Sequence, residues 1–239
     1  MLFKIIHEDP DLLVINKPAG LVCHPTKGDE YSSLISRVRL HLGAGSSAHL
    51  VNRLDRETSG VVLVAKSSEV AGELGKLWEA RAVQKEYLAI VHGHLREASR
   101  RLDFPLGKDL QSIVAIKDCV RADGAAAQTE YELIHRFDRA GQPFSLVRVQ
   151  PRTGRKHQIR IHLAHIGHPI VGDKLYGFDE DAYLALVQNR LTDEHRRKLV
   201  LPFQALHARR LSFHWRASER EFSAEPEELF QQFASMEKD

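Results

Sequence analysis

The amino-acid sequence predicts an α+β fold built on a mixed, largely antiparallel sheet with flanking helices. Short apolar runs rich in β-branched residues recur along the chain and are bounded by turn residues. Segments whose apolar residues follow helical spacing separate these runs. Since the chain carries no internal repeat and no low-complexity linker, we expect a single domain over residues 1–239.

The first part of the chain alternates predicted strands and helices. The apolar runs FKII and LLVIN indicate two short strands on either side of the turn HEDPD. Helical spacing of the apolar residues in YSSLISRVRLHL predicts a helix over 31–42. The run GVVLVAK indicates a buried strand, and the segment 67–83 that follows it predicts a helix capped by Ser67 or Ser68.

The later part of the chain predicts a hairpin, two helices and a helical insert. The run KEYLAIVHG indicates a strand, and QTEYELIHRF and FSLVRVQP indicate a hairpin joined by DRAGQP. A helix is predicted over 155–167, where Gly167 ends it. A polar, helix-prone insert follows at about 178–200. The strand ALHARRLSFHW and a terminal helix over 225–237 complete the chain.

Composition excludes several classes of protein. The formal net charge of +2 is too small for a protein that coats nucleic acid, although one basic face could still bind phosphate. We expect no membrane span and no signal peptide, because apolar runs are short and an acidic turn comes early. Cys23 and Cys119 make no disulfide framework, so we expect a cytoplasmic protein. We also expect a monomer, since no apolar stripe suits a dimer.

The stretch NRLDRETSG at 52–60 places charged side chains directly before a buried strand. A capped turn could explain Asp55, Thr58 and Ser59, with Gly60 relaxing the backbone. A turn does not require arginines on both sides of Asp55, however, and their positive charge would keep this carboxylate ionised. An ionised carboxylate on a fixed loop can act as a nucleophile, a base or a metal ligand.

A second dense stretch, PRTGRKHQIRIHLAHIGHPIVGDKLYG at 151–177, is strongly basic. The stretch contains one acidic residue, Asp173, and the basic residues Arg152, Arg155, Lys156, Arg160 and Lys174. On a helix, Lys156 and Arg160 would be four residues apart and share a face. Basic groups beside a helix N-terminus suit a phosphate, and a solvated basic face is the alternative.

Two further patterns have an ordinary structural explanation beside the functional one. The histidines of the basic stretch have helix-compatible spacing, but no carboxylate or cysteine completes a tetrahedral set and no H-E-x-x-H motif occurs. We therefore expect no metal. Tyr87, on the strand KEYLAIVHG, is either a core tyrosine or a ring on which a base stacks.

Taken together, these motifs resemble those of the RluA family of pseudouridine synthases. NRLDRETSG, KEYLAIVHG, RTGRKHQIRIHLAHIGHPIVGDKLYG and QALHARRLSF follow the order of that family, and the opening LLVINKPAGLVCHP matches its start. The resemblance covers about residues 3–215. It implies a pseudouridine synthase fold with a catalytic cleft across the middle of the sheet. Because it starts at residue 3, we expect the N-terminal S4-like domain of some relatives to be absent.

The resemblance also implies a reaction and the residues that perform it. A uridine in RNA is detached at its N1–C1′ bond, turned and rejoined through C5, without a cofactor or metal. Asp55 matches the nucleophilic aspartate, and Arg160 matches the basic residue that pairs with it. Tyr87 matches the tyrosine that packs on the target base, and Arg53 matches the arginine that helps to displace the nucleotide. We expect ribosomal or transfer RNA as the partner, with further contacts from Arg152, Arg155, Lys156 and His157.

One position departs from the family pattern, because the usual HRLD reads NRLD here. Asn52 can hydrogen-bond but cannot titrate or stack as histidine does. An RNA-binding protein of the same fold without catalytic activity is therefore an alternative, although the intact Asp55, Tyr87 and Arg160 argue against it. A metal-dependent hydrolase built on the histidines is a third interpretation. The insert at 178–200 either extends the rim of the cleft or is a surface embellishment.

Overall fold

The computed structural model describes residues 3–25, 32–43, 45–177 and 180–235. Contacts group the chain into two compact units. The first comprises Met1–Glu86 and His207–Leu229, and the second comprises Tyr87–Leu206 and Phe230–Asp239. The expected single domain over 1–239 stays a prediction, and each unit is described by itself.

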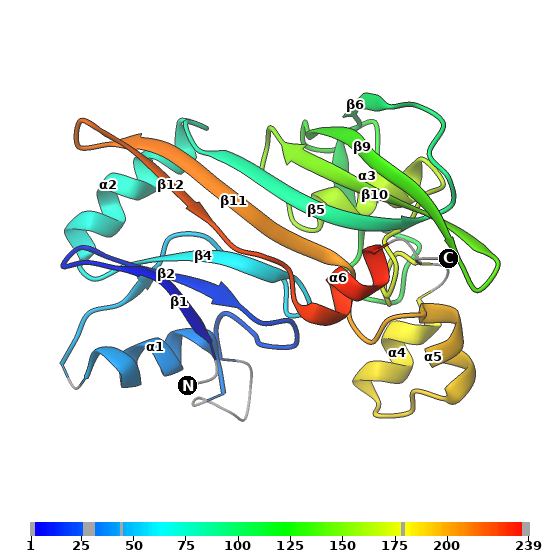
Figure 1. Cartoon of the computed structure of the whole chain (residues 1–239), viewed down its shortest axis with the longest axis horizontal. Coiled ribbons are helices and arrows are strands. Elements are labelled where there is room, and N and C mark those ends of the chain that lie inside the picture. Colours follow the sequence, from blue (N-terminus) through cyan, green and yellow to red (C-terminus); the bar gives the residue numbers. More distant parts are fainter. Residues whose placement is uncertain (1–2, 26–31, 44, 178–179, 236–239) are drawn as a thin grey trace. The chain divides into compact units, whose positions relative to one another are not determined.

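A sheet with the strand order β1-β2-β4-β11 is the framework of the first unit (Figure 1). In addition, β12 pairs with β11 and β3 pairs with β4. These pairs are antiparallel except for β4 and β11, which run parallel. The strands are β1 (Lys4–Glu8), β2 (Leu12–Lys17), β3 (His49–Leu50), β4 (Ser59–Ala65), β11 (Leu206–Trp215) and β12 (Ser218–Ser223).

The core of the first unit forms around β4, whose seven residues are all buried. Helix α2 (Ser68–Glu79) packs Val70 and Leu74 against apolar side chains from β2, β4 and β11. Ser67 caps this helix, since its side chain accepts a hydrogen bond from the Val70 amide at 3.2 Å. The expected cap is therefore confirmed at Ser67. The second helix of this unit is α1 (Leu34–Leu42).

An antiparallel sheet in the order β5-β10-β9-β6 is the framework of the second unit. Strand β5 begins in the first unit and belongs to the second from Tyr87 onward. A separate ribbon pairs β7 with β8. The strands are β5 (Gln84–His92), β6 (Ser99–Asp103), β7 (Leu106–Lys108), β8 (Asp118–Val120), β9 (Gln128–Arg139) and β10 (Gln142–Pro151).

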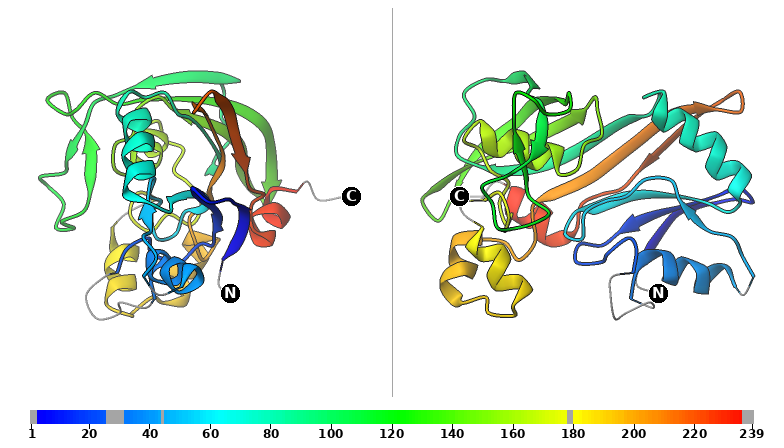
Figure 2. Two further views of the ribbon diagram at one scale, coloured as in Figure 1. Left: turned by 90° about the vertical axis from the view of Figure 1, so that its left-hand side faces the viewer. Right: turned by 180° about the vertical axis from the view of Figure 1, so that it is seen from behind.

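Helices complete the second unit. Helix α3 (Gln158–His165) buries Ile159 and Leu163 in the same apolar core as β5 and β10. From α6 (Glu228–Ala234), Phe233 joins this core by edge contact with Phe144 at 5.1 Å between ring centroids. The predicted helical insert holds two short helices, α4 (Asp181–Val187) and α5 (Asp193–Leu199), which stay together in both views of Figure 2.

The predicted α+β class with a mixed, largely antiparallel sheet is confirmed. Two local predictions are wrong. The predicted hairpin connection over 138–143 is only Ala140 and Gly141, because both adopt the positive φ that suits a two-residue turn. The helix predicted over 155–167 begins at Gln158, because His157 has a left-handed backbone with φ of 54°. Lys156 therefore precedes α3 and does not share a helix face with Arg160.

Three strands of the second unit were not predicted from the sequence. Strands β6, β7 and β8 occupy a region for which we predicted no strand, and most of their residues are at least partly exposed.

No helix in the described part of the chain is long and apolar enough to span a membrane.

Gly60 fixes the point where the 52–60 stretch enters the sheet. Its φ is +115°, and it lies opposite Ala208 in the parallel register of β4 and β11. A Cβ at this position would stand 2.2 Å from the Ala208 carbonyl oxygen. Only glycine fits this close approach of two backbones.

We predict that Gly60→Ala lowers the free energy of unfolding by more than about 3 kcal/mol, because the new Cβ forces β4 and β11 apart. Gly43→Ala is the matched control: Gly43 also has positive φ, at +91°, but nothing lies within 4 Å of a Cβ there. Backbone strain alone should cost Gly43→Ala roughly 1–2 kcal/mol. Urea unfolding of both variants tests this, and equal losses would contradict the close-approach explanation.

Candidate active site

The loop between β3 and β4 carries Asp55, and Asn52 ties this loop to β4. The Asn52 side-chain amide donates to the Val61 carbonyl at 3.1 Å, and its oxygen accepts from the Leu63 amide at 2.8 Å. Both the amide nitrogen and the oxygen of the Asn52 side chain are therefore hydrogen-bonded to the backbone of β4. Asn52, which departs from the family pattern, has a clear structural role in this protein.

Lys17 holds the other side of the same loop. This lysine, at the end of β2, has no exposed surface. Its ammonium donates to the carbonyl oxygens of Pro18 at 2.9 Å, Leu21 at 2.8 Å and Arg56 at 3.1 Å. Burial lowers the pKa of Lys17 to about 8, so the group is still mainly charged at pH 7. Three N–H donors therefore meet three carbonyl acceptors, one of them directly after Asp55 in sequence.

The turn that follows Lys17 adds further bonds to the aspartate loop. The Gly20 amide donates to the Arg56 carbonyl at 2.9 Å, and Arg56 Nε donates back to the Gly20 carbonyl at 3.2 Å. The Cys23 thiol donates to the Leu54 carbonyl at 3.3 Å. Burial raises the pKa of this thiol, which favours its neutral, donating form. The backbone on both sides of Asp55 is thereby bonded to residues 17–23.

Asp55 is half-buried within this frame, and Arg53 is exposed. The loop closes on itself where the Thr58 amide donates to the Asp55 carbonyl at 3.2 Å. Burial, followed by the charges of Arg53 and Arg39, lowers the pKa of His24, so Arg53 adds positive charge near His24. These positions suit the predicted roles of Asp55 as nucleophile and Arg53 as an RNA contact, which stay predictions.

His207 anchors the end of the loop. Its Nε2–H donates to the Ala224 carbonyl at 3.0 Å, so Nδ1 is the acceptor for the Ser59 hydroxyl at 2.9 Å. Burial lowers the pKa of His207 to about 4, which keeps the ring neutral at pH 7. The Ser59–His207 bond is thus a fixed structural contact beside Gly60.

Tyr87 is the first residue of the second unit and lies on β5. Its ring is half-buried and packs against the apolar core, and its backbone position faces Val149 on β10. A ring supported on one side by the core and partly open on the other can stack on a base. The geometry within this unit suits the predicted role of Tyr87 without testing it.

Arg160 is buried on α3 and forms an ion pair with Asp173. Its Nε and Nη2 donate to the two Asp173 oxygens at 2.7 and 2.8 Å. The carboxylate is fully buried, yet the Arg160 charge and the hydrogen bonds of Leu175 and Tyr176 hold its pKa below the usual value. Asp55 belongs to the first unit, so its predicted pairing with Arg160 stays a prediction.

Internal ion pairs engage two of the expected RNA-binding residues. Arg152 makes a two-nitrogen hydrogen bond to Glu130, at 3.0 and 2.6 Å, and Lys156 lies 3.0 Å from Asp118. Arg155 is exposed and donates to the Ala126 carbonyl at 3.2 Å, an uncharged partner. Arg155 therefore presents the least neutralised charge of these three basic side chains.

Buried Gln158 shapes this basic turn. Its side-chain oxygen accepts from the Thr153 hydroxyl at 2.7 Å and from the Arg155 amide at 3.0 Å. Its amide nitrogen donates to the Gln128 carbonyl at 2.8 Å and to the Thr129 hydroxyl at 2.9 Å. The turn is therefore fixed to the start of β9, which places Arg155 and Lys156 outside α3.

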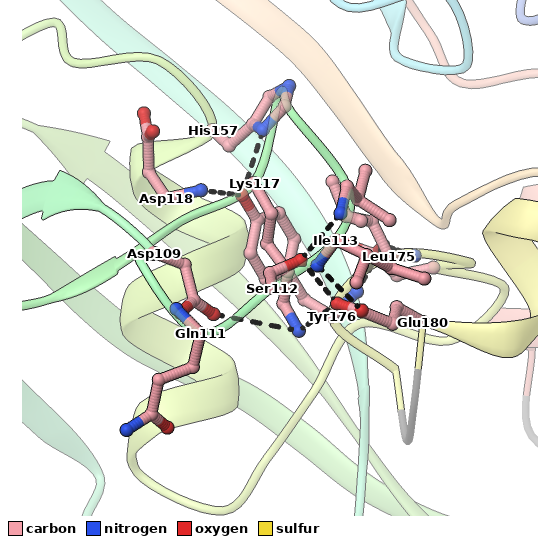
Figure 3. Close-up of polar contacts among 12 residues, drawn as sticks. Asp109, Gln111, Ser112, Ile113, Lys117, Asp118, His157, Leu175, Tyr176 and Glu180 are labelled. Atoms are coloured by element: carbon pink, nitrogen blue, oxygen red, sulfur yellow. Dashed lines mark hydrogen bonds and ion pairs between the residues drawn. The ribbon is translucent and has the colours of Figure 1, made fainter.

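The histidines of the basic stretch serve separate contacts. His157 Nδ1 lies 2.9 Å from the Tyr176 hydroxyl, as Figure 3 shows. Buried His162 is bonded to the Thr129 hydroxyl and the Phe104 carbonyl, and His168 is bonded to the His92 carbonyl. Within the described ranges, no group of three or more His, Cys, Asp or Glu side chains could hold a metal ion.

Comparisons with known proteins identify the family of this chain. The family model for RNA pseudouridylate synthase matches residues 11–165, well over half of the chain. The chain belongs to the RNA pseudouridylate synthase family. The RluA-type resemblance of the motifs is therefore confirmed.

Individual members of this family resemble the chain over most of its length. tRNA pseudouridine synthase C of Pasteurella multocida is 39% identical over 89% of this chain and 86% of that protein. Ribosomal large subunit pseudouridine synthase D of Nitrosomonas europaea is 36% identical over 86% of this chain. The chain spans only 56% of the length of that relative.

Solved structures of family members share the fold. Human RNA Pseudouridylate Synthase Domain Containing 4 is 28% identical, with a TM-score of 0.72 over 95% of this chain and 90% of that one. Human RNA Pseudouridylate Synthase Domain Containing 1 matches with a TM-score of 0.74 over 99% of this chain at 24% identity, which supports the fold alone.

Sequence reasoning missed three residues that shape the site: Lys17, Asp173 and Tyr176. The sequence motifs give Lys17 no separate role, and the other two residues lie in the basic stretch 151–177. No local signal identifies Lys17, because lysine is rarely buried. The signal for Asp173 is that it is the one acid in the basic stretch.

We predict that His207 makes stability depend on pH below neutrality. The unfolded chain binds a proton near pH 6.5, whereas the folded protein does so only near pH 4. More protons bind to the unfolded state in this window, so the free energy of unfolding should fall by about 3 kcal/mol from pH 7 to pH 4. Denaturant unfolding should show that His207→Gln removes this slope, whereas His214→Gln, at an exposed position of β11, retains it. Equal slopes in both variants would contradict the assignment.

Proposed function

We propose that this protein is an RNA pseudouridine synthase, an isomerase that converts specific uridines in ribosomal or transfer RNA to pseudouridine. Family membership supports the reaction class. The observation that carries the assignment of the site is the loop of Asp55, whose flanking backbone is bonded to Lys17, Gly20 and Cys23. A loop fixed in this way presents one carboxylate in a defined position, as nucleophilic catalysis requires.

In the proposed reaction, the Asp55 carboxylate attacks C1′ of the target ribose and uracil leaves with the N1–C1′ electron pair. The base turns, C5 attacks C1′, and the carboxylate leaves. The proton on C5 is then lost to a base or solvent, and N1 takes up a proton. Atoms and charge balance, so neither an oxidant nor a metal is a reactant.

The second unit supplies the other groups in this proposal. Arg160 stabilises the ionised carboxylate by charge, and Tyr87 supports the extruded base through its half-buried ring. Arg53 fills the gap left in the RNA after the nucleotide flips, which costs a few kcal/mol. Arg152, Arg155, Lys156 and His157 contact the RNA backbone, with Arg155 most available for a phosphate.

Recognition of RNA by this chain depends on shape and on unpaired nucleotides in our proposal. Relatives act, by name, on transfer RNA and on the large ribosomal subunit, and we propose one of these two classes as substrate. We further propose that the protein works in the cytoplasm as a monomer. Its two cysteines, Cys23 and Cys119, are both free thiols.

We predict that Asp55→Asn abolishes isomerisation and leaves RNA binding intact. Tritium release from RNA labelled at C5 of uridine should fall at least about 1,000-fold, because the amide is not a nucleophile. The RNA should come from cells that lack this gene, and transfer and ribosomal RNA should be assayed separately. Asp138→Asn is the matched control, since the Asp138 side chain is 65% exposed on β9. Full activity of Asp55→Asn would overturn the assignment, and binding without release by the wild type would favour the RNA-binding alternative.

We predict that the basic turn contributes unequally to RNA binding. The logarithm of the binding constant should fall linearly with the logarithm of salt concentration, with a slope of about −0.7 per neutralised phosphate for single-stranded RNA. Arg155→Gln should reduce this slope by about 0.7, because Arg155 has an uncharged partner. Arg152→Gln should reduce it less, because Glu130 already engages that guanidinium. Equal reductions, measured by filter binding at several salt concentrations, would contradict this ranking.

A further inference from the structure

The Arg160 guanidinium is held along one edge by a buried carboxylate. Asp173 lies 13 residues after Arg160 and accepts from its Nε and Nη2 at 2.7 and 2.8 Å. Asp173 is 1% exposed and Arg160 is 8% exposed. Two parallel hydrogen bonds to a planar guanidinium define its orientation as well as its distance.

Backbone groups fix the Asp173 carboxylate in turn. Its Oδ1 accepts from the amides of Leu175 at 2.9 Å and Tyr176 at 3.0 Å. The loop then closes where the Gly177 amide donates to the Asp173 carbonyl at 3.0 Å. A Cβ on Gly177 would stand 2.2 Å from that carbonyl oxygen, so glycine allows this tight turn. The carboxylate that orients Arg160 is therefore itself immobilised.

Tyr176 supports the face of the guanidinium. The Arg160 Cζ atom lies 5.0 Å from the centroid of the Tyr176 ring, a distance suited to a cation–π contact. The Tyr176 hydroxyl accepts from the Asp118 amide at 3.2 Å and lies 2.9 Å from His157 Nδ1 (Figure 3). Burial raises the pKa of this hydroxyl, so it stays neutral. The ring is thus anchored to β8 and to the start of α3.

The strand β8 that anchors the hydroxyl is itself tied to the helical insert. Glu180, directly before α4, accepts from the Ser112 hydroxyl at 2.5 Å and from Lys117 Nζ at 2.9 Å. Both donors lie in the segment between β7 and β8, and Figure 3 shows their contacts with Glu180. The insert thereby contacts the segment that leads into β8, where the Asp118 amide anchors Tyr176.

We propose that Asp173 and Tyr176 are positioning residues that orient the Arg160 guanidinium for the isomerisation. The inference rests on the proposed function, in which Arg160 stabilises a carboxylate. The bonds to Asp173 use Nε and Nη2, so Nη1 takes no part in them. A lysine cannot be oriented in this way, because its ammonium is a point charge on a flexible stem.

Stabilisation of the fold alone does not explain why an ion pair is buried at this position. Burial of two charges costs several kcal/mol of desolvation, and apolar residues of similar volume are often as stable. The pair here is surrounded by contacts that set direction: two parallel bonds, two backbone amides and a ring face. This arrangement meets the requirement that a catalytic group be held close to its productive geometry.

The decisive experiment measures single-turnover tritium release and RNA affinity for Tyr176→Leu, Tyr176→Phe and Asp173→Asn in the full chain. Tyr176→Leu removes the supporting ring, and we expect its rate constant to fall about 100-fold with RNA affinity unchanged. Tyr176→Phe keeps the ring and loses only the hydroxyl, so it should retain most of the rate. Tyr183→Phe, in α4, is the matched tyrosine control.

The amplitude of the single-turnover reaction separates a positioning role from a structural one. A positioning role lowers the rate constant and leaves the amplitude unchanged, because every folded molecule still reacts. Loss of folded protein alone would lower the amplitude of the reaction and leave the rate constant unchanged. That result would overturn the proposal.

A spectroscopic measurement makes the inference independent of activity. The Arg160 Nε–H should give a resolved signal that exchanges slowly with water, identified by its absence in Arg160→Lys. We expect exchange at this group to accelerate at least tenfold in Tyr176→Leu and to stay slow in Tyr176→Phe. Equally slow exchange in Tyr176→Leu would overturn the positioning role. Slow exchange in an inactive wild-type protein would instead overturn the proposed function.

Discussion

A lysine ammonium without exposed surface must find an acceptor for each of its three N–H groups, and this constraint organises the first unit. Lys17 meets it with three backbone carbonyls, of which the Arg56 carbonyl belongs to the aspartate loop. The loop therefore cannot move away without leaving a buried charge unsatisfied. Asn52 and Cys23 bond the same loop from other directions, so a segment without regular secondary structure is rigid around Asp55.

The second unit applies the same physical principle to a different side chain. A buried carboxylate, Asp173, is satisfied by one guanidinium and two backbone amides, and it thereby sets the direction of Arg160. In both units a buried polar group costs desolvation free energy and is stabilised only in one geometry. Such groups specify position more than they add stability, which is what a reaction at a single carbon atom requires.

The sequence predicted the parts of this structure that depend on local pattern. The apolar run after Gly60 identified β4, and the linked motifs identified the family. The role of Asp55 between its two arginines stays a prediction. Local patterns could not predict the contacts between segments that are distant in the sequence. Lysine is rarely buried, so nothing local announced Lys17 as a core residue. Lys156 pairs with Asp118 and precedes a left-handed His157, and helical spacing reveals neither feature.

In our proposal, buried Lys17 holds the aspartate loop in its reactive geometry. The most direct test is the initial rate of tritium release by Lys17→Met, with Lys66→Met as control, at a temperature where both variants are folded. Lys66 bonds to Glu8 on the same unit, away from the loop backbone contacts. We expect Lys17→Met to lose about 100-fold in rate with unchanged RNA affinity, whereas Lys66→Met should keep the wild-type rate. A wild-type rate for folded Lys17→Met would contradict this role of Lys17.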